Sequence, residues 1–452
     1  MLLALALMAL QSPTIQLEFE DGVLTGPKTS TERSGFSGTG YVTDFTHGND
    51  LVELRFRAKA GIYRAKVRYS APQGEKGYDL TLNGRTYTGM FTPTGDAFAD
   101  EDAGKVELKD GENVLLFGKG WGYYDVDAIS FAPAGPVERL AVPPLKLSDP
   151  KASAATKKVF SSLARIYGKK TASGQYNEKD TKYIEALAGR TPLIFGDDLM
   201  DYSPSRVERG ANPVGMAERL IARSKQGQIV TLSWHWNAPK DLVDTKTAEK
   251  DLSWYRGFYT EATTFDLANA LEGEDRDLLV RDIDAIAVQL KKLAAADVPV
   301  LWRPLHEADG RWFWWGAKGP DPFKRLWRLM HDRLTNHHGL HNLIWVTSHG
   351  LRPDWYPGDD VVDIVGIDAY PSDPTDPLST TWEELIRQYG GRKMLALTEF
   401  GGVPDVERAR RFGVRWAYFV SWTGSLGPEK VSKEELLRLY RQKAVENLSN
   451  RK

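Results

Sequence analysis

The chain has 452 residues, a formal net charge of −2 and no cysteine. This length exceeds that of one ordinary domain and fits two. The small net charge, without a basic stripe, excludes nucleic acid as an expected partner. The absence of cysteine excludes a disulfide framework, a thiolate metal site and a cysteine nucleophile.

The chain begins with an apolar run, residues 1–10, that is typical of a secretory signal peptide. We assign residues 1–12 to this signal and expect a secreted protein, either extracellular or periplasmic. The run is too short to span a bilayer, and no other segment reaches spanning length. We therefore expect no membrane partner.

Residues 13–133 have the pattern of an all-β domain. Segment 51–57 alternates apolar and polar residues, and Asn83-Gly84 is a turn signal between short strands. Several short strands at this spacing predict a β-sandwich, here of the jelly-roll type. The proline-rich residues 134–150 then predict a linker.

Residues 151–452 change to a rhythm of apolar strands alternating with amphipathic helices. Eight strands are expected, at 171–176, 192–197, 229–235, 298–307, 342–348, 361–370, 393–400 and 414–422. The helices expected between or before them include 153–167, 214–226, 275–295, 322–334 and 381–389. Eight such units in about 300 residues predict a (β/α)₈ TIM barrel. A doubly wound open sheet is the alternative, but the glycine-rich nucleotide turn expected near its first strand is missing.

Two glutamates, Glu307 and Glu399, stand at the expected ends of the fourth and seventh strands. Carboxylates at the C-terminal ends of barrel strands are placed for catalysis. Retaining glycosidases need two carboxyl groups about 5 Å apart, one protonated and one ionised. The chain also has 14 tryptophans, whose flat faces suit pyranose rings. The pair therefore indicates glycoside hydrolysis, although either glutamate alone could be an ion-pair partner of Arg303.

Four segments in order resemble glycoside hydrolase family 26, whose best-known members are endo-β-1,4-mannanases. RPLHEADGRWFWWG, at 303–316, resembles the acid/base segment of that family, and LTEFGG, at 397–402, its nucleophile segment. Residues 357–371 and 232–239 resemble its sixth-strand and third-strand signatures. The resemblance covers residues 153–448 and implies a retaining hydrolase that needs no cofactor for catalysis.

The resemblance implies roles for individual residues. Glu307 is expected to be the acid/base and Glu399 the nucleophile. His306 is expected to bond the sugar beside the scissile bond, Tyr370 to donate to the nucleophile, and Arg303 to orient a carboxylate. The full set of expected substrate-binding residues is His235, Arg303, His306, Trp312, Tyr370 and Trp422.

The chain departs from the family pattern at two places, Ala308-Asp309 and Ser348–Gly350. Both leave open the shape of the outer subsites and so the polysaccharide. We expect an endo-β-1,4-mannanase acting on mannan, glucomannan or galactomannan, and a monomer whose partners are β-mannan and manno-oligosaccharides. The alternatives are a β-1,3-1,4-glucanase or β-1,3-xylanase of the same family, or a non-catalytic polysaccharide-binding protein.

The first domain resembles carbohydrate-binding module family 35, through segments 17–20, 35–42 and 120–129. The resemblance implies a structural Ca²⁺ held by acidic residues of the first and last strands, and oxygen ligands suit this ion. The matching residues are Glu18, Glu20 and Asp127. Trp121 is the expected sugar-stacking residue of the module, with a packed core tryptophan as the alternative.

Overall fold

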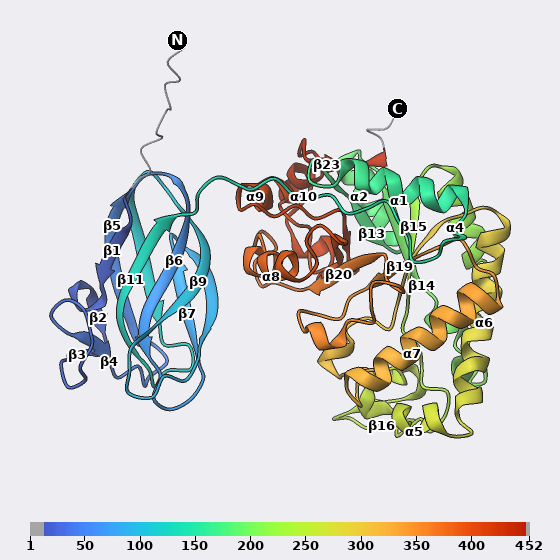
Figure 1. Cartoon of the computed structure of the whole chain (residues 1–452), viewed down its shortest axis with the longest axis horizontal. Helices are drawn as coiled ribbons and strands as arrows, with labels where there is room; N and C mark the ends of the chain where they lie inside the picture. Colours follow the sequence, from blue (N-terminus) through green and yellow to red (C-terminus); the bar gives the residue numbers. More distant parts are fainter. Residues whose placement is uncertain (1–12, 449–452) are drawn as a thin grey trace, which may run out of the picture. The chain divides into compact units, whose positions relative to one another are not determined.

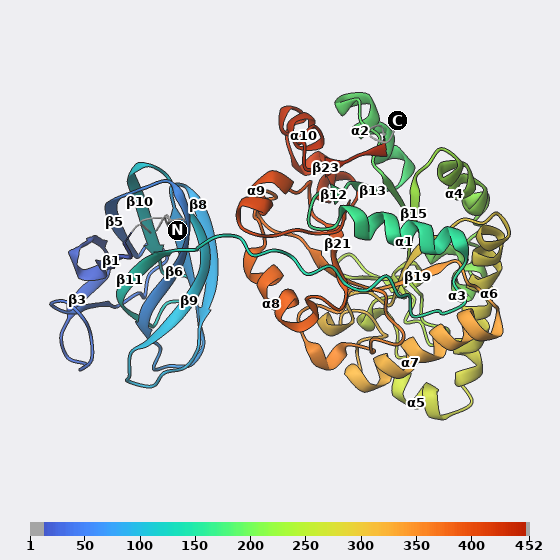
Figure 2. The ribbon, with the colours of Figure 1, turned by 45° about the horizontal axis from the view of Figure 1, so that its top comes forward.

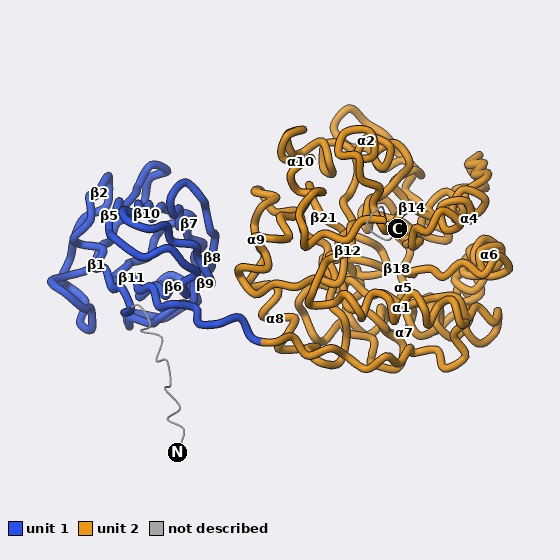
Figure 3. The backbone as a smooth tube through the Cα atoms, turned by 90° about the horizontal axis from the view of Figure 1, so that it is seen from above, with its two compact units in different colours: residues 1–138 blue, residues 139–452 orange. Residues whose placement is uncertain are grey.

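The computed structural model describes residues 13–448. The expected signal peptide at residues 1–12 lies outside the described residues. The chain divides into two compact units, residues 1–138 and residues 139–452 (Figure 3).

The first unit consists of two antiparallel sheets packed on each other. One has the strand order β3-β4-β11-β6-β9, with β1 also paired to β11, and the other has the order β2-β5-β10-β7-β8. The strands are β1 (Ile15–Glu18), β2 (Val23–Thr25), β3 (Lys28–Ser30), β4 (Tyr41–Thr43), β5 (Leu51–Ala58), β6 (Gly61–Ser70), β7 (Lys76–Leu82), β8 (Arg85–Phe91), β9 (Ala99–Leu108), β10 (Gly111–Gly118) and β11 (Asp125–Pro133). The expected β-sandwich is thus confirmed.

The core of the sandwich is largely aromatic. Alternate residues of β6 point inward, as period-2 patterning requires. Among them Tyr69 stacks on Phe91 with ring centroids 4.0 Å apart, and Tyr78 stacks on the other side of this cluster, between Phe91 and Phe117. The rings fill the space between the sheets and hold them together.

The second unit is a closed barrel of eight parallel strands in chain order (Figure 1), which confirms the predicted TIM barrel. Its strands are β13 (Gly174–Tyr176), β14 (Ile194–Asp198), β15 (Ile229–Trp234), β18 (Val300–Pro304), β19 (Leu343–Thr347), β20 (Ile364–Ala369), β21 (Met394–Phe400) and β22 (Phe419–Ser421). Because all eight strands run in the same direction, their C-terminal ends meet at one rim.

Helices surround the barrel on the outside (Figure 2). They are α1 (Ala154–Ile166), α2 (Glu178–Ala188), α3 (Pro204–Val207), α4 (Met216–Lys225), α5 (Leu267–Glu272), α6 (Arg276–Ala295), α7 (Pro320–Asp332), α8 (Ser379–Tyr389), α9 (Val406–Arg411) and α10 (Lys433–Tyr440). Side chains such as Ser153 before α1 and Asn177 before α2 accept from the first free N–H groups and fix where each helix begins. Within residues 13–448, no helix is both long and apolar enough to cross a bilayer.

The prediction of a single first strand at 171–176 was wrong. The chain forms β12 (Thr171–Ala172), which pairs in parallel with β23 (Val445–Glu446), and only then enters the barrel as β13. Ser173 marks the change of partner, because its N–H and its hydroxyl both donate to the carbonyl of Glu446. The C-terminal segment therefore pairs with the residues that lead into the first barrel strand, while β22 closes the barrel against β13.

The largest differences in strand length are at the fourth and eighth strands of the barrel. The expected strand 298–307 ends at Pro304, because Leu305 adopts a left-handed conformation with φ 51° that no strand can contain. The expected strand 414–422 is ordered as a strand only over Phe419–Ser421. Glu307 therefore lies on a loop three residues past the end of β18, not on the strand itself.

Candidate active site

Arg303, at the end of β18, is the centre of a buried network of charges. Its guanidinium donates to Glu399 Oε2 at 2.6 Å and to Asp368 Oδ2 at 2.7 Å. It also donates to the hydroxyl oxygen of Tyr176 at 3.1 and 3.2 Å, and to Ser348 Oγ at 3.3 Å. With 1% of the residue exposed, Arg303 orients the two carboxylates and leaves no free face for a sugar. These contacts are those of the carboxylate-orienting residue expected above, and the place of Arg303 in the substrate-binding set stays a prediction.

A bulge in β21 brings the two carboxylates side by side. Ile367 of β20 is opposite Leu397, but the next residue, Asp368, is opposite Glu399, so Thr398 is the extra residue. The Thr398 hydroxyl donates to Asp368 Oδ1 at 2.7 Å. A Cβ on Gly366 would lie 2.3 Å from the Thr398 methyl group, so only glycine fits opposite the bulge.

Tyr370 follows β20 and hydrogen-bonds the other oxygen of Glu399. Its hydroxyl donates to Oε1, while Arg303 occupies Oε2. Burial, and next the Glu399 carboxylate, raise the pKa of Tyr370 above its usual range, so the phenol stays protonated and remains a donor. Glu399 thus accepts from two donors, one in β18 and one directly after β20, and they fix where its carboxyl group points.

Glu307 has the opposite environment. Its N–H donates to the Ser348 carbonyl at 2.7 Å, and its carboxyl receives one hydrogen bond, from Trp312 Nε1 to Oε2 at 2.9 Å. Burial, followed by the charges of Asp368 and Glu399, raises its pKa to about 8. At neutral pH this carboxyl therefore keeps its proton.

The two histidines form a chain that starts at Asp198, the last residue of β14. His235 Nδ1 bonds Asp198 Oδ2, and His235 Nε2 lies 3.1 Å from His306 Nε2. Burial would raise the pKa of Asp198, but its bonds with His235 hold it at about 2. Burial, with Arg303 and His235 nearby, lowers the pKa of His306 well below its usual value.

His306 is 1% exposed, and its contact in the site is the hydrogen bond between its Nε2 and that of His235. His306 Nδ1 has no hydrogen-bond partner among the described residues, and the expectation that His306 bonds the sugar directly stays a prediction. His235 is the more accessible of the two, with 12% of its side chain exposed, and its ring lies among Phe258, Phe313 and Trp422.

The remaining aromatic residues lie where a ligand can reach them. Trp312 is 49% exposed, and Trp422 is partly buried, with its ring edge against Tyr176 at 5.0 Å between centroids. Trp312 lies on the loop after β18, and Trp422 directly follows β22, the eighth barrel strand, so both stand at the C-terminal rim.

Sequence reasoning missed Asp368, Asp198 and Tyr176. All three stand at the C-terminal ends of barrel strands, the same signal that singled out the two glutamates. Asp368 also lies within the segment 357–371 whose resemblance to a family signature was noted. Their positions at strand ends could thus be predicted, but the partners that surround these three side chains could not.

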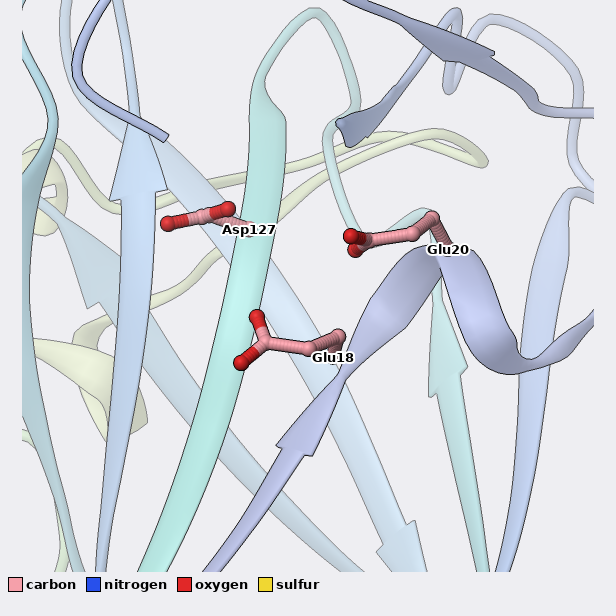
Figure 4. Close-up of side chains that lie close together, drawn as sticks. All are labelled: Glu18, Glu20 and Asp127. Carbon is pink, nitrogen blue, oxygen red and sulfur yellow. The ribbon is translucent and has the colours of Figure 1, made fainter. Parts of the chain in front are cut away.

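In the first unit, three carboxylates converge on a common point (Figure 4). One oxygen each of Glu18, Glu20 and Asp127 lies within 4.8 Å of the others. Glu20 Oε2 is buried and receives no hydrogen bond, although Oε1 accepts from the N–H groups of Thr39 and Gly40. Three oxygen donors with an unsatisfied buried oxygen fit a hard cation such as Ca²⁺.

Trp121 lies on the loop between β10 and β11 and is 62% exposed, so it is not a core residue. The backbone N–H of Trp121 donates to the Gly77 carbonyl at 2.8 Å. The indole lies over Gly77, where an added Cβ would be 3.0 Å from Nε1. Tyr123, on the same loop, is 50% exposed. The loop therefore presents two aromatic rings to solvent from a fixed backbone.

Comparisons with known proteins agree with this architecture. Residues 148–447 match the family model described as glycosyl hydrolase family 26, and residues 15–134 match carbohydrate binding module family 35. A mannan endo-1,4-β-mannosidase of Thermothelomyces thermophilus is 44% identical over 90% of this chain and 83% of its own length. Mannan endo-1,4-β-mannosidase A of a Piromyces species is 32% identical over 98% of this chain and 73% of its own length.

The crystal structure of a Podospora anserina GH26-CBM35 β-(1,4)-mannanase covers 96% of this chain and 98% of its own chain, with 42% identity and a TM-score of 0.71. A ruminal GH26 endo-β-1,4-mannanase has the same coverage and TM-score at 28% identity. The chain is therefore a member of glycosyl hydrolase family 26 with a carbohydrate-binding module of family 35 at its N-terminal side.

Proposed function

We propose that this protein is a retaining endo-β-1,4-mannanase in which Glu307 is the acid/base and Glu399 the nucleophile. The observation that carries the proposal is the contrast between the two carboxyls. Glu307 has a pKa raised to about 8, while Glu399 accepts from the Arg303 guanidinium and the Tyr370 hydroxyl. One acid and one carboxylate at the same rim are what double displacement at an anomeric carbon requires.

The reaction follows from this contrast. Glu399 attacks the anomeric carbon while the Glu307 proton passes to the leaving oxygen, which gives a glycosyl ester on Glu399. That ester has no charge, so the pKa of Glu307 falls and its carboxylate now takes a proton from water. The water oxygen attacks the anomeric carbon from the side that the leaving sugar vacated, and the bond from this carbon to Glu399 breaks, so the configuration is retained.

Mannan as the substrate is supported by the mannan endo-1,4-β-mannosidases and β-mannanases that the chain resembles along most of its length. A β-1,3-1,4-glucanase or a β-1,3-xylanase has the same catalytic pair and differs in a few sugar contacts. Rates on galactomannan, lichenan and β-1,3-xylan separate these candidates.

We also propose that the protein is secreted and acts as a monomer, and that the first unit holds the enzyme on its polysaccharide. The apolar run at residues 1–10 supports export. A bound module raises the local enzyme concentration at an insoluble substrate.

Replacing Glu399 with alanine should abolish hydrolysis of galactomannan. Turnover should fall by more than about 10³-fold, because no covalent intermediate can form. The rate is measured by reducing-end release, and anomeric configuration in the wild type by proton NMR. Glu434→Ala, at an exposed carboxylate of α10, is the control and should keep the wild-type rate. Hydrolysis by Glu399→Ala at the wild-type rate, with intact binding, would point to another nucleophile.

The pH profile should report Glu307. Because Glu307 donates a proton, kcat/KM should be high below its pKa and decline as pH rises through about 8. Glu399→Gln removes one of the charges that raise this value, so the pKa of Glu307 should be lower in that variant. Titration of ¹³C-labelled glutamate by NMR measures both values. An unchanged Glu307 titration in Glu399→Gln would contradict the electrostatic coupling.

Calcium should stabilise the first unit through Glu18, Glu20 and Asp127. Addition of EGTA should lower the melting temperature of this unit by several degrees, because a ligand bound only to the folded state stabilises it. Glu20→Gln should weaken the response to calcium, whereas Asp21→Asn, at the exposed neighbouring acid, should keep it. Calorimetry with and without EGTA decides, and identical melting curves for the wild type would argue against a cation site.

Trp121→Ala should weaken adsorption to insoluble mannan by about tenfold, the effect of losing one stacked ring and its buried area. Depletion isotherms in the Glu399→Ala background avoid digestion of the substrate. Met90→Ala, at an exposed apolar residue of β8, serves as the control. Equal adsorption of the Trp121 variant and its control would remove Trp121 from the binding surface.

A further inference from the structure

The loop after β18 folds back so that one of its own side chains reaches Glu307. Glu307 and Arg311 both adopt left-handed conformations, with φ 52° and 60°. Between them Gly310 lies beneath the indole of Trp312, and an added Cβ there would be 2.0 Å from the ring. Left-handed non-glycine residues are strained, and strain of this kind persists where the surrounding structure requires it.

The backbone next to Trp312 is fixed by a second segment. The Trp312 carbonyl accepts from the N–H of Thr260 at 2.8 Å, and the Arg311 carbonyl accepts from the Thr260 hydroxyl at 2.7 Å. The indole itself is 49% exposed, so its position is set by the loop and not by core packing.

The bond from Trp312 Nε1 to Glu307 Oε2 is therefore held from both ends. Among residues 13–448, no other group donates to the Glu307 carboxyl. An indole N–H can donate but cannot accept, so Oε2 must be the accepting oxygen. In the protonated acid the hydrogen then resides on Oε1.

We propose that Trp312 is a positioning residue that, through this hydrogen bond, determines which oxygen of Glu307 carries the transferable proton and how readily that oxygen releases it. This inference rests on the proposed role of Glu307 as acid/base. In the first step the Oε1–H bond and the glycosidic bond break, the hydrogen bonds to the leaving sugar oxygen, Glu399 bonds to the anomeric carbon, and Glu307 becomes a carboxylate. In the second step a water O–H bond breaks and its hydrogen returns to Oε1, while the water oxygen bonds to the anomeric carbon and the bond from that carbon to Glu399 breaks.

The hydrogen bond also opposes the other influences on Glu307. Burial, Asp368 and Glu399 raise the pKa of this carboxyl, while the indole N–H lowers it, because the N–H binds the carboxylate more strongly than the acid. Trp312 thus favours release of a proton that the rest of the site retains.

Trp312→Phe tests this directly, since it keeps an aromatic ring for the sugar and removes only the N–H. The alkaline limb of kcat/KM on mannan should move to higher pH by about half to one unit. The maximal kcat should fall several-fold, because the proton is no longer confined to Oε1 and is held more tightly. If the variant lost only its stacking on the sugar, KM would change and the pH of the alkaline limb of kcat/KM would not.

Trp315→Phe is the matched control in the same loop. The Trp315 indole is fully buried and donates to the His306 carbonyl at 2.9 Å. The variant therefore loses an N–H hydrogen bond near the site, but that bond does not involve the Glu307 carboxyl. Its melting temperature should drop while its alkaline limb stays at the wild-type pH. An alkaline limb that moves equally in both variants would overturn the inference.

An aryl mannobioside with a dinitrophenolate leaving group gives a second readout. This group departs without a proton, so the burst of phenolate release in Trp312→Phe should match the wild type, whereas the rate on mannan does not. Glu307→Ala, run in parallel, should retain the burst and lose activity on mannan.

The outcomes separate the two claims. If Glu307→Ala behaves in this way and Trp312→Phe has a wild-type alkaline limb, the role of Trp312 is overturned and the proposed function stands. If Glu307→Ala hydrolyses mannan at the wild-type rate, the proposed function is overturned together with the inference.

Discussion

The fork that Arg303 makes to Asp368 and Glu399 is the interaction on which the site depends. One cation is buried with two carboxylates, so charge compensation within the fork is incomplete. Burying charges is costly and is repaid only when each has partners in good geometry. Here the guanidinium, the Ser348 and Thr398 hydroxyls and the Tyr370 phenol supply those partners. The remaining negative charge acts on Glu307, the next carboxyl along the rim.

The geometry of the barrel makes this arrangement possible. Arg303, Asp368 and Glu399 come from β18, β20 and β21, and they meet because their strands end at the same rim. The single extra residue in β21 turns Glu399 into register with Asp368. Without the bulge, alternation along the strand would direct one of the two carboxylates away from the guanidinium. A local irregularity of backbone therefore fixes the charge distribution of the whole site.

Both fold classes could be predicted from sequence, because period-2 and strand–helix patterns depend only on which residues are apolar. The two glutamates could be predicted as well, since the sequence alone shows a carboxylate that follows an apolar strand. The partners of Arg303 and the burial of His306 could not, because they depend on how far each strand is rotated about the barrel axis. The end of β18 was missed for a related reason: Leu305 is apolar and continues the strand pattern, while its backbone is left-handed.

The parallel pairing of β12 with β23 joins the start of the barrel unit to residues 445–446, more than 270 positions later in the chain. During synthesis, at about 5–20 residues per second, the sandwich can complete all its strand pairs while the barrel still lacks its final segment. Thr171 has to wait for Ala444 to emerge before its N–H finds the carbonyl it bonds in the native state. The catalytic unit therefore completes its strand pairing only once residue 446 has been made, and until then its nascent form is exposed to misassociation and to proteases.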